Sequence, residues 1–233
     1  MGKTIIQQAR GHGSKTYRVR PKAYIYKIQY PKLDVVGKAK VLDLINSPAH
    51  SSPLAKMSIN NETFYIPAAN GLYQGQEIEI GSNKLEIGNI VQLKDVPFDT
   101  RIFNIEIRPG DGGKMVRTSG NSAGVIRRTE KKVILLMSNK KEIELDPNCR
   151  VTVGIIAGAG RTSKPVVKAG KKHHMMKARN KLWPRTSAVK FNAVDHPFGG
   201  GRGKRIKSKI AKRNAPAGAK VGHIRPSRTG HIR

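Results

Sequence analysis

The chain is short of acidic residues over its last eighty positions. Residues 154–233 contain 21 Lys and Arg but a single acid, Asp195, and carry +20 of the net charge of +30. Residues 1–30 contain no acid at all and carry +7. Segments this basic repel themselves and lack the apolar content for a core of their own. We therefore expect residues 1–20 and the tail from about residue 170 to be extended and to become ordered on a polyanion.

Cysteine and long apolar runs are also scarce. The single cysteine, Cys149, excludes an intramolecular disulfide framework and fits a reducing cytosol. No run of eighteen apolar residues is present, so we expect no membrane span. The first residues, MGKTIIQQARGHG, have no apolar region typical of a signal peptide. These absences predict a cytoplasmic location.

The two basic ends predict a nucleic-acid partner. Each Lys or Arg that neutralises a phosphate releases a condensed counterion, which is the main source of nucleic-acid affinity. Between the ends, residues 31–96 carry −1 and residues 97–153 carry +4. Only this middle part has the charge balance of a self-folding segment, and its roughly 120 residues suffice for one domain or two small ones.

The middle part has the pattern of a β protein. Short stretches rich in Val, Ile and Leu recur about every ten residues, bounded by Gly, Pro, Asn or Asp. This spacing predicts small barrels or a sandwich instead of alternating strands and helices. We expect a mainly β fold with strands at residues 33–45, 63–67, 77–80, 87–96, 101–108, 124–129, 132–137, 141–145 and 150–156.

Within residues 101–108 the apolar and polar side chains alternate imperfectly. Phe103, Ile105 and Ile107 form the set expected to face a core, so their neighbours Asn104 and Glu106 are expected to face away from it.

The N-terminal segment mixes tyrosines with basic residues. Tyr24, Tyr26 and Tyr30 can either stack on bases or pack on a barrel, and their alternation, typical of an edge strand, favours packing. Just before them lies a glycine-punctuated basic stretch, in which the backbone can come close to phosphates. Phosphate contact is favoured there over a solvated tail.

Three motifs point to other chemistry without adequate support. Residues 120–124, GNSAG, match a serine nucleophile motif but lack the alternating strands and helices that it requires. Residues 154–164, GIIAGAGRTSK, lack the lysine spacing of a phosphate loop, and no helix is expected to follow. Cys149, His173 and His174 match no common zinc spacing. We expect no metal and no cofactor.

The segment most informative about function is residues 192–201, where the only acid of the tail precedes a histidine. Asp195 and His196 could tune a general base, which would make the chain an RNA-acting enzyme. Alternatively the carboxylate orients the imidazole or contacts RNA, and the glycines that follow allow close packing against a phosphate backbone. Because no nucleophile or metal set accompanies the pair, we favour the contact role.

Residues 194–205, VDHPFGGGRGKR, resemble the most distinctive stretch of the universal large-subunit ribosomal protein family number two. Further blocks resemble the family in order along the chain: 10–20, 96–126, 145–154 and 213–224. The first and last of these blocks are similar to the archaeal or eukaryotic branch. Phe198, which stands where bacterial members have a second histidine, also suits an archaeal-type member.

The resemblance implies a basic N-terminal extension over 1–30, an oligonucleotide-binding-fold (OB-fold) barrel over 31–96, an SH3-like barrel over 97–168 and an RNA-penetrating extension over 169–233. It implies a structural constituent of the large ribosomal subunit that binds ribosomal RNA near the peptidyl-transferase centre and supports subunit association, tRNA binding and peptide-bond formation. His196 aligns with a histidine once suggested to take part in peptide-bond formation. We expect it to contact RNA and not to act as a catalyst.

The implied partners are large-subunit ribosomal RNA, neighbouring ribosomal proteins, small-subunit RNA at an intersubunit bridge and nearby tRNA, with no membrane and no homo-oligomer. A free-standing basic RNA- or DNA-binding protein would share the charge pattern but not the ordered blocks. The residues expected to contact RNA are Arg10, His12, Lys15, Arg18, Arg20, Lys114, Arg117, Arg161, Lys171, Lys172, His173, His174, Lys177, Arg179, Trp183, Asn192, Asp195, His196, Gly199, Gly200, Gly201, Arg202, Lys204, Arg205, Arg213, Arg225 and Arg228.

Overall fold

The structure is a computed structural model that describes residues 3–204 and 210–226. The chain divides into two compact units. One, here called the β unit, comprises Pro21–Pro165. The other, here called the extension unit, joins the two ends of the chain, Met1–Arg20 and Val166–Arg233.

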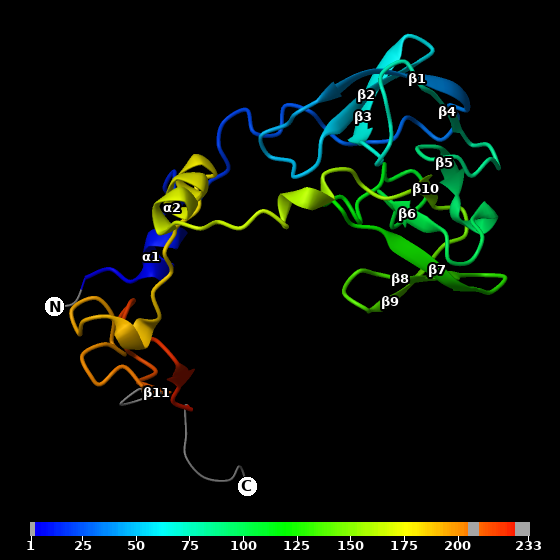
Figure 1. Ribbon diagram of the computed structural model, residues 1–233. Helices are drawn as coiled ribbons and strands as arrows, with labels where there is room; N and C mark the ends of the chain where they lie inside the picture. The colour runs from blue at the N-terminus through cyan, green and yellow to red at the C-terminus, as the bar shows by residue number, and fades with distance from the viewer. Residues whose placement is uncertain (1–2, 205–209, 227–233) are drawn as a thin grey trace, which may run out of the picture. The chain divides into compact units, whose positions relative to one another are not determined.

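Ten strands of the β unit form one hydrogen-bonded sheet in the order β3-β2-β1-β4-β5-β10-β6-β7-β8-β9. Figure 1 shows β1–β4 on one side of this unit and β6–β9 on the other. Neighbouring strands are antiparallel except for β4 and β5, which are parallel. The strands are β1 (Gly37–Ile45), β2 (Leu54–Ile59), β3 (Glu62–Pro67), β4 (Glu77–Ile80), β5 (Ile90–Gln92), β6 (Arg101–Phe103), β7 (Ala123–Arg128), β8 (Val133–Leu136), β9 (Glu142–Leu145) and β10 (Arg150–Val153), with 3-10 helices at Leu93–Asp95 and Ala159–Arg161.

The mainly β prediction is confirmed, and each strand predicted from sequence overlaps an observed strand. The prediction missed β2, whose sequence LAKMSI contains only one β-branched residue. Strand β2 forms because it lies between β1 and β3 and its backbone pairs with both. Tertiary pairing here overrides a weak intrinsic preference.

Two hydrophobic clusters fill the β unit. The first includes Met57, Ile66 and Phe103, and the second includes Ile102 and Leu135. Successive side chains of a strand point to opposite faces, so adjacent residues of β6 enter different clusters. The division into an OB-fold barrel and an SH3-like barrel at residue 97 stays a prediction.

The alternation expected over residues 101–108 is confirmed for Phe103 and Ile105, which are buried, and is wrong for Asn104, Glu106 and Ile107. Asn104 has φ +49°, in the left-handed region, so β6 ends there and the facing of later side chains is reset. Glu106 is consequently fully buried, whereas Ile107 is 46% exposed. Asn104 is also buried, and its backbone carbonyl accepts a hydrogen bond from the Tyr30 hydroxyl at 2.6 Å.

The tyrosines of residues 24–30 behave differently from one another. Tyr30 is buried and its hydroxyl also lies 2.6 Å from Thr152 Oγ1, which confirms packing for this residue. The ring of Tyr26 lies 5.0 Å from that of Tyr65. Tyr24, by contrast, is 61% exposed. The segment forms only an isolated bridge at Ile28, so the expected edge strand is wrong.

The extension unit contains regular structure, so the expectation that both ends are extended throughout is wrong. Its elements are α1 (Ile6–Gly11), α2 (Ala169–Ala178), a 3-10 helix at Ala188–Lys190, and the short parallel strands β11 (Ile210–Ala211) and β12 (His223–Ile224). Helix α2 begins shortly after residues 154–164, where no helix was expected. In the part of the chain that the structure describes, no helix is long and apolar enough to cross a membrane.

Candidate nucleic-acid interface

Most of the predicted RNA contacts lie together in the extension unit. Only Lys114, Arg117 and Arg161 lie in the β unit. Arg205 and Arg228 fall outside the described residues. The extension unit contains 24 Lys and Arg and one acid, and each Lys and Arg that is described there is exposed. This unit therefore presents cations that are almost uncompensated by acids.

Helix α2 has no continuous apolar stripe and no buried residue. Its first turn contains Lys171 and Lys172 and no acid, which is unfavourable next to the positive end of the helix dipole. At its other end, Arg20 Nη1 donates a hydrogen bond to the carbonyl oxygen of Ala178 at 2.6 Å. Such a helix gains little from packing, so its basic surface, with Lys177, is suited to an anionic partner.

Aromatic and imidazole groups lie among these cations. Lys172 Nζ lies 5.5 Å from the centroid of the Trp183 ring. The rings of His173 and His174 meet edge to face, with centroids 5.5 Å apart. His12 Nδ1 lies 2.7 Å from the carbonyl oxygen of Gln8. Across residues 3–204 and 210–226, no three His, Cys, Asp or Glu side chains gather as a metal site would require.

The loop around His196 is held by its own backbone. The N–H groups of Asp195 and His196 both donate to the carbonyl oxygen of Asn192, at 3.0 and 3.2 Å. The N–H of Gly200, whose φ is +78°, donates to the carbonyl oxygen of Phe191 at 3.1 Å. A Cβ at position 199 would lie 2.4 Å from the carbonyl oxygens of Phe191 and Asn192. Glycines 199 and 200 are therefore required by the loop itself, before any contact with RNA; Gly201 is exposed.

The imidazole of His196 is buried, with only 7% of the residue exposed. Its Nδ1 accepts a hydrogen bond from the backbone N–H of Phe198 at 3.1 Å, so the ring hydrogen of the neutral form is on Nε2. The ring stacks on Phe191, with centroids 6.3 Å apart and planes 19° apart. Phe198 lies on it at a tilt, with centroids 5.1 Å apart.

Asp195 does not orient this imidazole. Among the described residues its recorded side-chain partner is Lys3, whose Nζ lies 3.5 Å from Asp195 Oδ1. The backbone N–H of Lys3 also donates to the carbonyl oxygen of Val194 at 2.7 Å. The residues before α1 thus hold the loop that carries His196, and the Asp195–His196 side-chain pairing considered from the sequence is not among the recorded contacts of the described residues.

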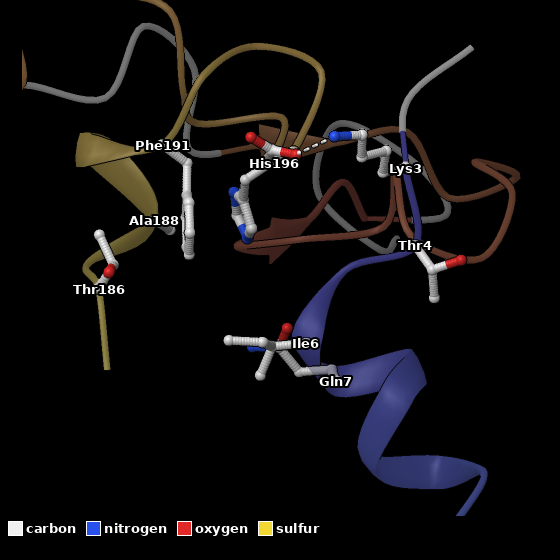
Figure 2. A pocket seen from close by; sticks show the side chains of 9 residues that line it. Lys3, Thr4, Ile6, Gln7, Thr186, Ala188, Phe191 and His196 are labelled. Carbon is white, nitrogen blue, oxygen red and sulfur yellow. Dashed lines mark ion pairs between the residues drawn. The ribbon is translucent and has the colours of Figure 1, made fainter. Parts of the chain in front are cut away.

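A cavity of about 290 Å³ lies beside this loop. Figure 2 shows the His196 ring directed into it, between Phe191 and Ile6. Gln7 and Thr186 also line it, and the Lys3–Asp195 pair borders it. Sequence reasoning missed all of these except Asp195 and His196, because the lining residues come from segments at opposite ends of the chain and no local motif unites them.

The predicted contacts in the β unit are partly engaged within the protein. Arg117 donates from Nε to Asn104 Oδ1 and from Nη2 to the carbonyl oxygen of Ile28, both at 3.1 Å. Burial is the largest cause of the lowered pKa of the Arg117 guanidinium. Arg161 Nε donates to Ser119 Oγ at 3.0 Å. Lys114 is exposed.

The comparisons with known proteins agree on one family. The family model described as "Ribosomal Proteins L2, C-terminal domain" matches residues 86–218. The protein named "Large ribosomal subunit protein uL2" from Archaeoglobus fulgidus is 46% identical over 235 residues, which cover 99% of this chain and 99% of the relative. The chain belongs to the uL2 family.

Other members of the uL2 family match equally completely. The relative from Hyperthermus butylicus, with the same printed name, is 44% identical over 99% of this chain and 98% of its own length. The relative from Methanococcus vannielii is 40% identical over 99% of both chains. All three organisms' proteins carry the name of a large ribosomal subunit protein, and the resemblance stated from the sequence blocks is confirmed.

Proposed function

We propose that the chain is a structural constituent of the large ribosomal subunit that binds ribosomal RNA. The observation that carries this proposal is its membership of the uL2 family at 46% identity over nearly the whole length of both chains. The family is one of structural ribosomal components, so the chain is not an enzyme. Its place of action is the cytoplasm, within the large subunit.

The extension unit supplies the charge for RNA binding. Its exposed cations, including Lys171, Lys177 and Arg202, neutralise phosphates and release counterions. Folded ribosomal RNA is recognised through shape, phosphates, 2′-hydroxyls and unpaired bases more than through a groove code. Ordering a basic segment costs conformational entropy, and these contacts offset that cost. The scarcity of acids follows, because each acid would repel the RNA.

The β unit supplies rigid surfaces. We assign residues 31–96 to an OB-fold barrel and residues 97–168 to an SH3-like barrel, with the extensions 1–30 and 169–233 reaching into RNA. The presence of two hydrophobic clusters supports two barrels, although Phe103 belongs to the first cluster and Val91 and Leu93 to the second, so the clusters do not divide at residue 97. Lys114, Arg117 and Arg161 are the β-unit residues proposed to approach RNA.

The position in the subunit follows from the family resemblance. The chain lies near the peptidyl-transferase centre, next to neighbouring ribosomal proteins. It supports subunit association through small-subunit RNA at an intersubunit bridge, and it supports tRNA binding and peptide-bond formation. His196 acts there as an RNA contact. Its burial, its Nδ1 bond to Phe198 and the pairing of Asp195 with Lys3 support contact over proton transfer.

A competition experiment tests the RNA partner. Purified full-length chain is bound to labelled large-subunit ribosomal RNA at physiological salt and challenged with excess small-subunit RNA or tRNA. We expect the complex to resist both competitors and to yield to unlabelled large-subunit RNA. Equal displacement by all three RNAs would mean that the chain is a nonspecific basic binder.

A further inference from the structure

The cavity beside His196 is bordered by a ring N–H that has no recorded partner among residues 3–204 and 210–226. His196 is 93% buried, since 7% of the residue is exposed. Its Nδ1 is used by the N–H of Phe198, so the neutral ring has its hydrogen on Nε2. No described residue forms a recorded hydrogen bond with Nε2. Nε2 is not among the fully buried side-chain atoms that lack a partner, and the ring is directed into the cavity, so this N–H is free to donate to an acceptor placed there.

The walls of the cavity are suited to a flat, uncharged group. Phe191, Ile6 and Ala188 provide apolar surface, and Phe191 provides an aromatic ring. Gln7 and Thr186 provide side-chain donors and acceptors at the same cavity. Aromatic side chains stack with nucleobases irrespective of sequence, and polar groups read the edges of a base.

Charge argues against a phosphate as the occupant. The single lysine at this cavity, Lys3, is paired with the carboxylate of Asp195 at 3.5 Å, so the lining is close to neutral. A phosphate placed here would meet an acidic side chain and no free cation of the lining. The phosphates of an RNA strand have better partners nearby, because Lys220 lines a second cavity that also includes His196.

Size restricts the occupant further. The volume of about 290 Å³ lies just below the range for small-molecule sites, about 300–1,000 Å³. It is adequate for one base or nucleoside but not for a stacked run of nucleotides.

We propose that this cavity takes a single unpaired base of ribosomal RNA, which stacks on Phe191 and accepts a hydrogen bond from His196 Nε2. The proposal rests on the proposed function, because it takes the partner to be ribosomal RNA. It adds a distinct contribution to binding: the extension unit holds phosphates by charge, and this cavity holds one base by stacking and hydrogen bonding. The N-terminal residues Ile6 and Gln7 complete the site.

The salt dependence of RNA affinity separates a base contact from a phosphate contact. Losing a phosphate contact lowers the slope of log affinity against log salt, whereas losing a base contact weakens binding at every salt concentration equally. We would measure binding of the full-length chain to large-subunit ribosomal RNA over a range of salt. The variants are Phe191→Leu, His196→Leu and His196→Gln.

Phe198→Leu is the matched control. It makes the same chemical change next to the same imidazole, but Phe198 lines the second cavity and not this one. Circular dichroism of each variant reports whether the unit remains folded.

We expect Phe191→Leu and His196→Leu to weaken binding by roughly tenfold with an unchanged salt slope. His196→Gln, whose amide N–H reaches a similar position to Nε2–H, and Phe198→Leu should stay within about twofold of the original chain. If the slope of log affinity against log salt falls by the amount expected for one lost phosphate contact, the proposal is overturned in favour of a phosphate site. Unchanged affinity in all variants, or equal losses in Phe191→Leu and Phe198→Leu, would show that the rings only pack the loop. If the unmodified chain shows no preference for large-subunit RNA, the proposed function itself fails.

Discussion

Asp195 and Lys3 form an ion pair, with 3.5 Å between Asp195 Oδ1 and Lys3 Nζ, although His196 is the next residue in the chain. The carboxylate that could have tuned the imidazole instead fastens the N-terminal segment to the loop. His196 therefore lacks the acidic partner that a general base of the Asp–His type requires. The arrangement favours a role for His196 in contacting RNA and not in proton transfer.

This assignment predicts different outcomes for two replacements of His196. The Gln side chain keeps an N–H of similar reach but does not titrate near neutral pH. Purified large subunits that contain His196→Gln should retain most peptide-bond formation once assembled. The pH profile of peptide-bond formation should be the same in these subunits as in subunits that contain Asp195→Asn. His196→Ala should impair assembly or tRNA binding more. Subunits with Gln that assemble normally yet lose the chemical step by several orders of magnitude would establish the general-base role.

The buried ion pair of the β unit predicts a large stability effect. Arg150 Nη2 donates to Glu106 Oε1 at 2.9 Å, and the residues are 5% and 0% exposed. Glu106→Gln removes the carboxylate charge and leaves the buried guanidinium without a counter-charge, which costs about 3–5 kcal/mol. Urea denaturation followed by circular dichroism should show this loss in the full-length chain. As a control, Glu144→Gln breaks the exposed pair with Lys132 and should leave the midpoint unchanged.

The charge of the extension unit predicts that the affinity for RNA falls steeply with salt and that truncation reduces this dependence. Residues 171–233 contain 18 Lys and Arg, of which a part contacts phosphates at any one time. Each contact adds about 0.7–0.9 to the slope of log affinity against log salt. Deletion of residues 171–233 should therefore lower the slope for large-subunit RNA by several contacts. An unchanged slope would assign the phosphate contacts to the β unit.

The single cysteine predicts a pH-dependent reactivity. Burial, followed by the charge of Asp146, raises the pKa of the Cys149 thiol from 9.0 to about 12. The folded thiol should resist alkylation at pH 8–9 and react quickly once urea unfolds the chain. Because the folded pKa is the higher one, this thiol's contribution to stability is complete below about pH 9 and is lost as the pH rises towards 12. Fast alkylation of the folded chain at pH 8 would contradict the burial.

The sequence predicted the strands of the β unit well because their apolar residues recur between turn residues. It missed β2, whose Ala, Lys and Met are not typical strand residues, because pairing with β1 and β3 is a tertiary effect. It missed α2 because the helix lacks the apolar stripe by which a helical period is recognised. Asn104 reset the facing of residues after β6, which no local pattern indicated.

The candidate site was predictable only in part. The Asp195–His196 dipeptide and the glycines after it pointed to the loop. The partner of Asp195 could not be predicted, because Lys3 is at the other end of the chain and the contact depends on how the two ends fold together. The cavity depends on the same association, since Gln7 and Thr186 reach it from opposite ends of the sequence.

Sedimentation of a cell extract tests the central claim most directly. Ribosomal subunits are separated on a sucrose gradient at low magnesium, and the chain is followed by immunoblot, with RNase-treated extract as the control. The chain should sediment with the large subunit and leave that fraction only when the RNA is digested. Sedimentation as free protein near the top of the gradient, or with the small subunit or chromosomal DNA, would contradict its assignment to the large ribosomal subunit.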